Sequence, residues 1–128
     1  MKYQFKYIKI GSYYRPLIPI ALRDDDKIID FHALIDSGAD FNLFPGHIAD
    51  ILEIDLRHGK SEKIGGVAGS AKAYPYALDI GIQNKFYHAP LVFSHEVTLD
   101  KFGLLGQRGF FDRFVVEFNY TKGYIVLK

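Results

Sequence analysis

The stretch ALIDSGADFNLF (residues 33–44) runs an apolar segment into Asp36, follows it with Ser37 and Gly38, and places a second aspartate at Asp40. The apolar residues before Asp36 are typical of a strand that is buried in a core. A carboxylate at the end of a buried strand must be paired or used, because an unpaired buried charge is very costly. The environment of Asp36 therefore bears on both the fold and the function.

Length and composition limit the possible functions. The 128 residues suffice for one domain with a real core and are too few for two ordinary domains. The formal net charge of +1 gives no reason to expect a nucleic acid or a membrane as partner. The lack of cysteine excludes disulfides, thiolate metal sites and a cysteine nucleophile. Since no signal peptide or membrane span is evident, we expect a soluble, cytoplasmic protein.

Most of the chain predicts β-strands. Phe, Tyr, Ile, Val and Leu alternate with polar residues or come in short bursts between turn residues. The predicted strands and hairpins cover residues 3–8, 15–22, 28–35, 60–78, 77–93 and 114–128. The predicted turns include the acidic run at residues 24–26, Gln83 with Asn84, and Lys122 with Gly123. The sequence therefore indicates a mainly β protein.

Only residues 45–56 predict a helix, as a short cover on a sheet. Pro45 stands where the first turn would begin, which suits its fixed backbone angle. The apolar residues expected on one helical face are Ile48, Ile51, Leu52 and Leu56. Further along, FGLLGQRGFFDRF (residues 102–114) predicts an apolar burst that leads into a helical turn.

Other candidate sites have simpler explanations. The five histidines lack the spacing of a zinc site, so no metal and no other cofactor is expected. The glycine-rich residues 65–69 lack the Lys-Ser/Thr ending of a phosphate-binding loop and fit a hairpin tip. Ser37 does not stand in a G-x-S-x-G nucleophile elbow. Asp36 with Ser37 and Gly38 alone fits an ordinary turn aspartate that accepts bonds from neighbouring amides.

The motifs around Asp36 change this balance. The order along the chain is RPLIPIAL (15–22), ALIDSGAD (33–40), KIGGVAGS (63–70), GLLGQRGFF (103–111) and VVEFNYTKGYIVL (115–127). Together they resemble, over nearly the whole chain, the retropepsin-like aspartic proteases, which include the retroviral proteases and their cellular and bacterial relatives. The resemblance implies that residues 1–128 form a single-domain retropepsin-like acid-protease β-barrel, mainly β, with a flap hairpin and one or two short helices.

The resemblance also implies an activity, that of an aspartic endopeptidase. Such an enzyme hydrolyses extended peptides between apolar residues, using an activated water. One carboxylate cannot be general base and general acid at once, so the single Asp36 requires a second chain. We expect a homodimer with the site on its two-fold axis. Two like charges so close together share one proton, as the carboxylate pair of aspartic proteases is known to do.

The resemblance assigns roles to individual residues. Asp36 takes the catalytic position, Ser37 hydrogen-bonds across the dimer axis, and Gly38 lets the substrate backbone approach. The implied flap closes over the peptide and excludes water. The implied substrate-binding residues are Ala39, Asp40, Phe41, Leu43, Gly65, Gly66, Val67, Phe102 and Leu104.

Two departures from the family pattern leave an alternative open. After Gly106 the family usually has an Arg that braces the active-site loop, whereas Gln107 stands here and Arg108 follows, so the brace is either shifted by one residue or lost. The closing hairpin is also longer than in the retroviral proteases, where end strands interleave between subunits. The main alternative is a catalytically weak or silent dimeric peptide-binding module of the same fold; a heterodimer with another subunit is a further one.

Overall fold

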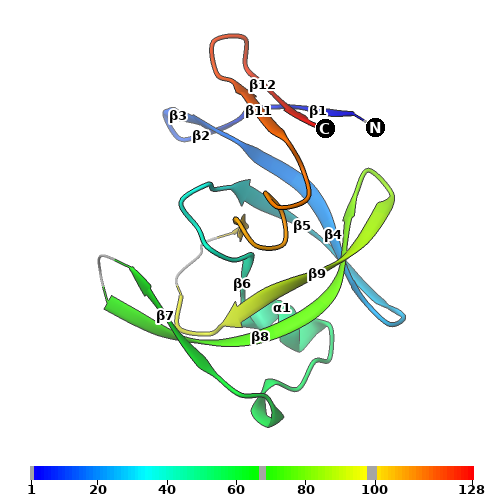
Figure 1. The fold of residues 1–128 in the computed structure, drawn as a ribbon, viewed down its shortest axis with the longest axis vertical. Coiled ribbons are helices and arrows are strands. Elements are labelled where there is room, and N and C mark those ends of the chain that lie inside the picture. Colours follow the sequence, from blue (N-terminus) through cyan, green and yellow to red (C-terminus); the bar gives the residue numbers. More distant parts are fainter. Residues whose placement is uncertain (1, 67–68, 98–100) are drawn as a thin grey trace.

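The structure, a computed structural model, describes residues 2–66, 69–97 and 101–128 (Figure 1). Val67 of the predicted flap tip lies outside the described residues. In chain order, the elements are β1 (Tyr3–Lys6), β2 (Ile8–Ile10), β3 (Tyr13–Arg15), β4 (Leu17–Asp24), β5 (Lys27–Ile35), β6 (Leu43–Pro45), α1 (Gly46–Ile51), the 3-10 turn η1 (Leu56–His58), β7 (Glu62–Gly66), β8 (Gly69–Ile82), β9 (Lys85–Ser94), β10 (Gly103–Leu105), β11 (Val116–Asn119) and β12 (Tyr124–Leu127).

The main sheet closes into a barrel. Its order is β4-β5-β10-β6-β9-β8-β7, and β4 also pairs with β8. Strands β4, β5, β10, β6, β9 and β8 therefore form a closed ring. Strand β7 pairs only with β8 and lies outside this ring, as the projecting hairpin in Figure 1. Closure satisfies the strand edges that would otherwise be open. The predicted mainly β barrel with a projecting hairpin is confirmed.

The barrel encloses an apolar core. Its largest fully buried side chains are Phe44, Phe93, Phe110, Ile18, Leu22, Ile48, Leu78, Ile80, Ile82, Leu105, Ile125 and Leu127. Alternation along β8 explains how one strand supplies Leu78, Ile80 and Ile82, because successive side chains point to opposite faces. Ala33 and Ile35 of β5 are buried in the same core, which fixes the register of β5 and places Asp36 directly after its end.

Both chain termini lie in a second sheet of order β1-β12-β11. Tyr3 pairs with Leu127 and Lys6 with Tyr124, so the two end strands are partners within one chain (Figure 1). The turn between β11 and β12 contains Gly123 at φ +80, a left-handed conformation that glycine adopts without strain. The predicted closing hairpin is confirmed.

The sequence placed several boundaries wrongly. The first strand ends at Lys6 and not at residue 8, the hairpin of β2 and β3 was not expected, and the next strand begins at Leu17 and not at residue 15. After the predicted apolar burst, residues 107–113 form a series of turns. At their end, the amide of Phe114 donates to the carbonyl of Phe110 at 3.0 Å.

The predicted helix over residues 45–56 is too long. Helix α1 ends at Ile51, and Glu53 then adopts a left-handed φ of 57° that no helix continues through. Ile51 is 54% exposed, so its placement on the apolar face was wrong, whereas Ile48 and Leu52 are buried. After the helix, Ile54 packs in the core, and its amide donates back to the carbonyl of Ala49 at 2.9 Å.

Candidate active site

The chain turns sharply after β5 and presents Asp36. The Asp36 amide donates to the carbonyl of Leu105 at 2.9 Å, which continues the parallel pairing of β5 with β10. One carboxylate oxygen, Oδ1, accepts the amide of Gly38 at 2.9 Å. The half-buried carboxylate has no other hydrogen bond or ion pair to the described residues. Its Oδ2 atom is thus left available for water or a ligand.

The segment after β10 braces this turn from the side. The Gln107 amide donates to the carbonyl of Ala39 at 2.8 Å, and the Arg108 amide donates to that of Asp40 at 2.9 Å. The Gln107 side chain donates from Nε2 to the carbonyl of Ser37 at 2.8 Å. The Arg108 guanidinium instead lies 5.5 Å from the centre of the Phe41 ring. The side-chain brace therefore comes from a neutral amide.

Asn42 is fully buried, and its side chain links the loop after β5 to β9 and to the residue that follows β10. Its Oδ1 accepts the Gly106 amide at 3.0 Å, and its Nδ2 donates to the carbonyl of Pro90 at 3.1 Å. Both bonds leave the Asn side chain with partners for its carbonyl and its amino group, as a buried polar group requires.

Gly106 lies where there is no room for a side chain. A Cβ atom added there would collide with the carbonyl oxygens of Phe41 and Ala39. The close approach of the two segments therefore requires glycine at this position.

A cleft of about 440 Å³ runs between this loop and strand β7 of the β7–β8 hairpin. Its lining residues are Asp36, Gly38, Ala39, Asp40, Phe41, Leu43, Glu62, Lys63, Ile64, Gly65, Val92 and Leu104. Most of the predicted substrate-binding residues thus lie together in one cleft. Ser37 is exposed beside it and Phe102 is half-buried outside its lining. Gly66 pairs with Gly69 where β7 ends, and Val67 lies outside the described residues.

Sequence reasoning missed several residues of the site. Glu62, Lys63 and Ile64 precede the glycine-rich tip, and their position on a strand pairing with β8 could have suggested cleft-facing side chains. Asn42 has no local signal, because its partner Gly106 lies 64 residues away. The sequence marks Gln107 as the residue that stands where the family pattern has a bracing Arg, but its partner Ser37, 70 residues away, could not be found from it.

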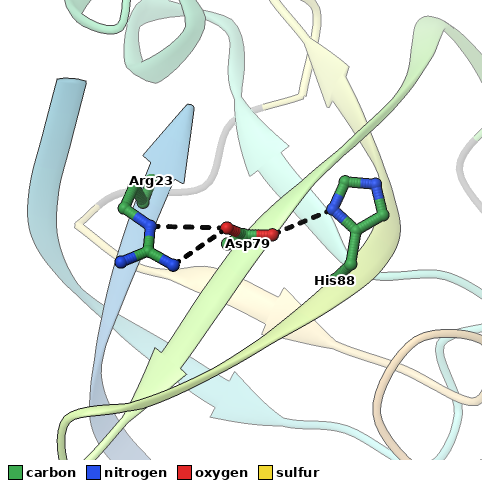
Figure 2. A network of polar contacts seen from close by, with 3 residues as sticks. All are labelled: Arg23, Asp79 and His88. Atoms are coloured by element: carbon green, nitrogen blue, oxygen red, sulfur yellow. Dashed lines mark hydrogen bonds and ion pairs between the residues drawn. The ribbon is translucent and has the colours of Figure 1, made fainter. Parts of the chain in front are cut away.

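A separate polar network lies on β4, β8 and β9 (Figure 2). Asp79 accepts from Nη2 of Arg23 at 3.0 Å, and Nδ1 of His88 lies 2.9 Å from its other oxygen. These hydrogen bonds, from His88 first and Arg23 second, hold the pKa of Asp79 below its ordinary value. None of the three residues lines the cleft. The network therefore bears on stability and pH dependence, not on the candidate site.

Residues 2–66, 69–97 and 101–128 contain neither a metal site nor a membrane-spanning helix. Within the described residues, no group of three or more His, Cys, Asp or Glu side chains is placed to hold a metal ion. None of the helices in that part of the chain has the length and hydropathy needed to cross a bilayer.

Comparison with known proteins identifies the fold. No protein-family model and no curated protein matches the sequence. The solved structure of a retropepsin-like aspartic protease from Rickettsia conorii matches with a TM-score of 0.71, covering 99% of this chain and 91% of that one. The fold is retropepsin-like. Sequence identity to that protein is 21%.

A viral structure agrees with this assignment. EIAV protease, solved in complex with the inhibitor HBY-793, matches with a TM-score of 0.55 and 17% identity, over 78% of this chain and 88% of that one. The predicted resemblance to retropepsin-like aspartic proteases is thus confirmed at the level of fold. In the retropepsin-like barrel of this chain, the cleft next to Asp36 is the candidate active site.

Proposed function

We propose that the protein is an aspartic endopeptidase that acts as a cytoplasmic homodimer. The observation that carries this proposal is the half-buried Asp36 at the end of a barrel strand, with Oδ2 facing no protein partner in the described residues. The carboxylate lies in a cleft between its own loop and a β-hairpin. Such a cleft suits an extended peptide, which would lie against backbone groups on both sides.

The chemistry requires two carboxylates in different protonation states. An ionised Asp36 takes a proton from water, and its protonated twin polarises the scissile carbonyl. Two ionised carboxylates about 4 Å apart would repel by about 4 kcal/mol at an effective dielectric constant near 20, which favours a single shared proton. The Asp36 of a second copy of this chain supplies the twin.

Other residues of the cleft position the substrate. Gly38 lies at the surface of the loop without a side chain, so the substrate backbone can approach Asp36. Leu43 and Leu104 pair across β6 and β10 and offer an apolar floor for side chains of the peptide. The hairpin of β7 and β8 acts as the flap, which excludes water from the reacting groups.

The test is cleavage of a mixed peptide library by the wild type and by Asp36→Asn. Asp36→Asn is expected to abolish cleavage while circular dichroism and the melting temperature show a folded protein. Asp50→Asn is the matched control, because Asp50 is an exposed aspartate on α1 that lies outside the cleft. Undiminished cleavage by folded Asp36→Asn would falsify the proposal. Sedimentation of the pure chain should give a dimer, and a strict monomer that still cleaves peptides would refute the shared site.

A catalytically silent peptide-binding module is the second candidate. The observation that favours it is the Gln107 side chain, which holds the loop where the family pattern has arginine. A silent module would bind library peptides, as measured by retention on the immobilised protein. It would cleave none of them between about pH 3 and 8, the range in which Asp and His side chains titrate. Cleavage that Asp36→Asn removes would exclude this candidate.

A further inference from the structure

The peptide unit between Ser37 and Gly38 is held at both ends. Its carbonyl oxygen, on Ser37, accepts Nε2 of Gln107 at 2.8 Å. Its N–H, on Gly38, donates to Oδ1 of Asp36 at 2.9 Å. A peptide unit is planar and rigid, so the direction of its carbonyl fixes the direction of its N–H. One side chain, 70 residues away from Ser37, thus sets the orientation of the donor that faces the Asp36 carboxylate.

We propose that Gln107 is a positioning residue for Asp36, acting through the Ser37–Gly38 peptide plane. The bond to Ser37 is made by a side chain, whereas the neighbouring bonds to Ala39 and Asp40 are made by main-chain amides. Substitution of position 107 by any residue with a main-chain N–H keeps these main-chain bonds. The orientation of the Ser37–Gly38 plane therefore depends on the Gln107 amide group, while the course of the loop does not.

The direction of the bonds adds to this effect. Gln107 donates to the carbonyl of a peptide unit whose N–H donates in turn to Asp36. Hydrogen bonds in such a chain polarise one another. Gln107 is exposed and carries no charge, so it strengthens the Gly38 donor without placing a cation beside Asp36. Arg108 does not substitute for it, since its guanidinium lies over the Phe41 ring.

This inference rests on the proposed peptidase function, and its test has one measurement that does not. In the wild type, the Gly38 amide proton signal should lie downfield in nuclear magnetic resonance spectra and should shift as Asp36 titrates. Gln107→Met has a side chain of similar length without a donor, and we expect it to move that signal upfield and weaken its pH dependence. Gln107→Arg restores a donor and should restore the signal.

Kinetics on a cleaved library peptide should follow the same order. Gln107→Met is expected to lower kcat by about 10- to 100-fold, since small misplacements of reacting groups have effects of this size. KM and the melting temperature should change little, because the bond lies at the surface and does not touch the substrate. Gln4→Met, on the exposed face of β1, is the matched control and should behave as the wild type in every assay.

Two outcomes would overturn the inference. If the Gly38 signal and kcat of Gln107→Met equal those of the wild type, the side chain does not position Asp36. If Gln107→Met lowers the melting temperature and Gln107→Arg restores neither the signal nor kcat, the side chain has a structural role only. If no peptide is cleaved by the wild type, the peptidase proposal fails, and the Gly38 signal still decides whether Gln107 orients the peptide plane.

Discussion

Asn42 is the residue whose substitution should cost the most stability near the candidate site. Its side chain is fully buried and holds the Gly106 amide and the Pro90 carbonyl, which come from segments far apart in the sequence. Asn42→Ala removes the hydrogen bonds that these two main-chain groups make to the Asn42 side chain. Replacement by alanine also opens a small cavity, which adds to the loss.

The loss of unfolding free energy can be estimated from the two groups that lose a hydrogen bond, the Gly106 amide and the Pro90 carbonyl. The buried Gly106 amide left without a hydrogen bond costs about 1–3 kcal/mol, and loss of the part-buried bond to Pro90 adds about 1 kcal/mol. With the cavity, Asn42→Ala should lose about 4 kcal/mol of unfolding free energy. A change of 1 kcal/mol shifts the melting temperature of a domain of this size by about 3–5 °C. We therefore expect the melting temperature to fall by about 10–20 °C.

The assay is urea and thermal unfolding of the variants at one fixed protein concentration, because dimerisation would make the midpoints depend on concentration. Asn119→Ala is the control, since Asn119 lies in the β11–β12 hairpin and bonds Tyr124 and the Lys122 amide there. We expect this control to lose about 1 kcal/mol, the ordinary worth of a bond near the surface. A loss below about 1 kcal/mol for Asn42→Ala would refute the reasoning.

Three further predictions follow from the rest of the molecule. The pKa of Asp79 is lower in the folded protein than its ordinary value of 3.8. The stability that Asp79 contributes is therefore present above pH 3.8 and is lost as the pH falls through the folded pKa. Urea unfolding should show Asp79→Asn less stable than the wild type at pH 7, and this difference in unfolding free energy should shrink toward pH 3. Tyr87 is buried and donates to the Gly109 carbonyl at 3.1 Å, so Tyr87→Phe should cost about 1 kcal/mol in the same assay. Gly106→Ala would force a methyl group against two carbonyl oxygens of the active-site loop and should lower both thermal stability and cleavage, whereas Gly65→Ala meets no atom within 4 Å and should leave stability unchanged.

Local turn chemistry could be predicted from the sequence because it depends on neighbouring residues. Gln83 and Asn84 join β8 and β9 with φ values of 49° and 68°, the conformation of the tight hairpin turn that their position suggested. The same holds for the turn after β5, where the Asp36 side chain accepts the amide two residues on. The hydrogen bond at Oδ1 fits both interpretations of Asp36, as an ordinary turn aspartate and as a catalytic residue. The cleft beside Asp36 is what favours the catalytic interpretation.

The end of α1 could not be predicted from hydrophobic period. Ile48 and Leu52 repeat at helical spacing and both are buried, but α1 ends at Ile51, and Leu52 is already the residue that caps it. The residue that breaks the helix is Glu53 at φ 57°, and glutamate has no local preference for that conformation. Packing of the following segment therefore overrides the local signal.

Asn42 and Gln107 show two different ways in which distant partners define the candidate site. Asn42 is buried, so its bonds replace water that cannot reach the loop, and its loss should appear as lower stability. Gln107 is exposed, so water replaces its bond at little cost, and its loss should appear as a changed orientation of one peptide unit. Asn42→Ala should lower the melting temperature, whereas Gln107→Met should lower kcat and leave the melting temperature unchanged. These two results together would separate the stability of the loop from the orientation of Asp36.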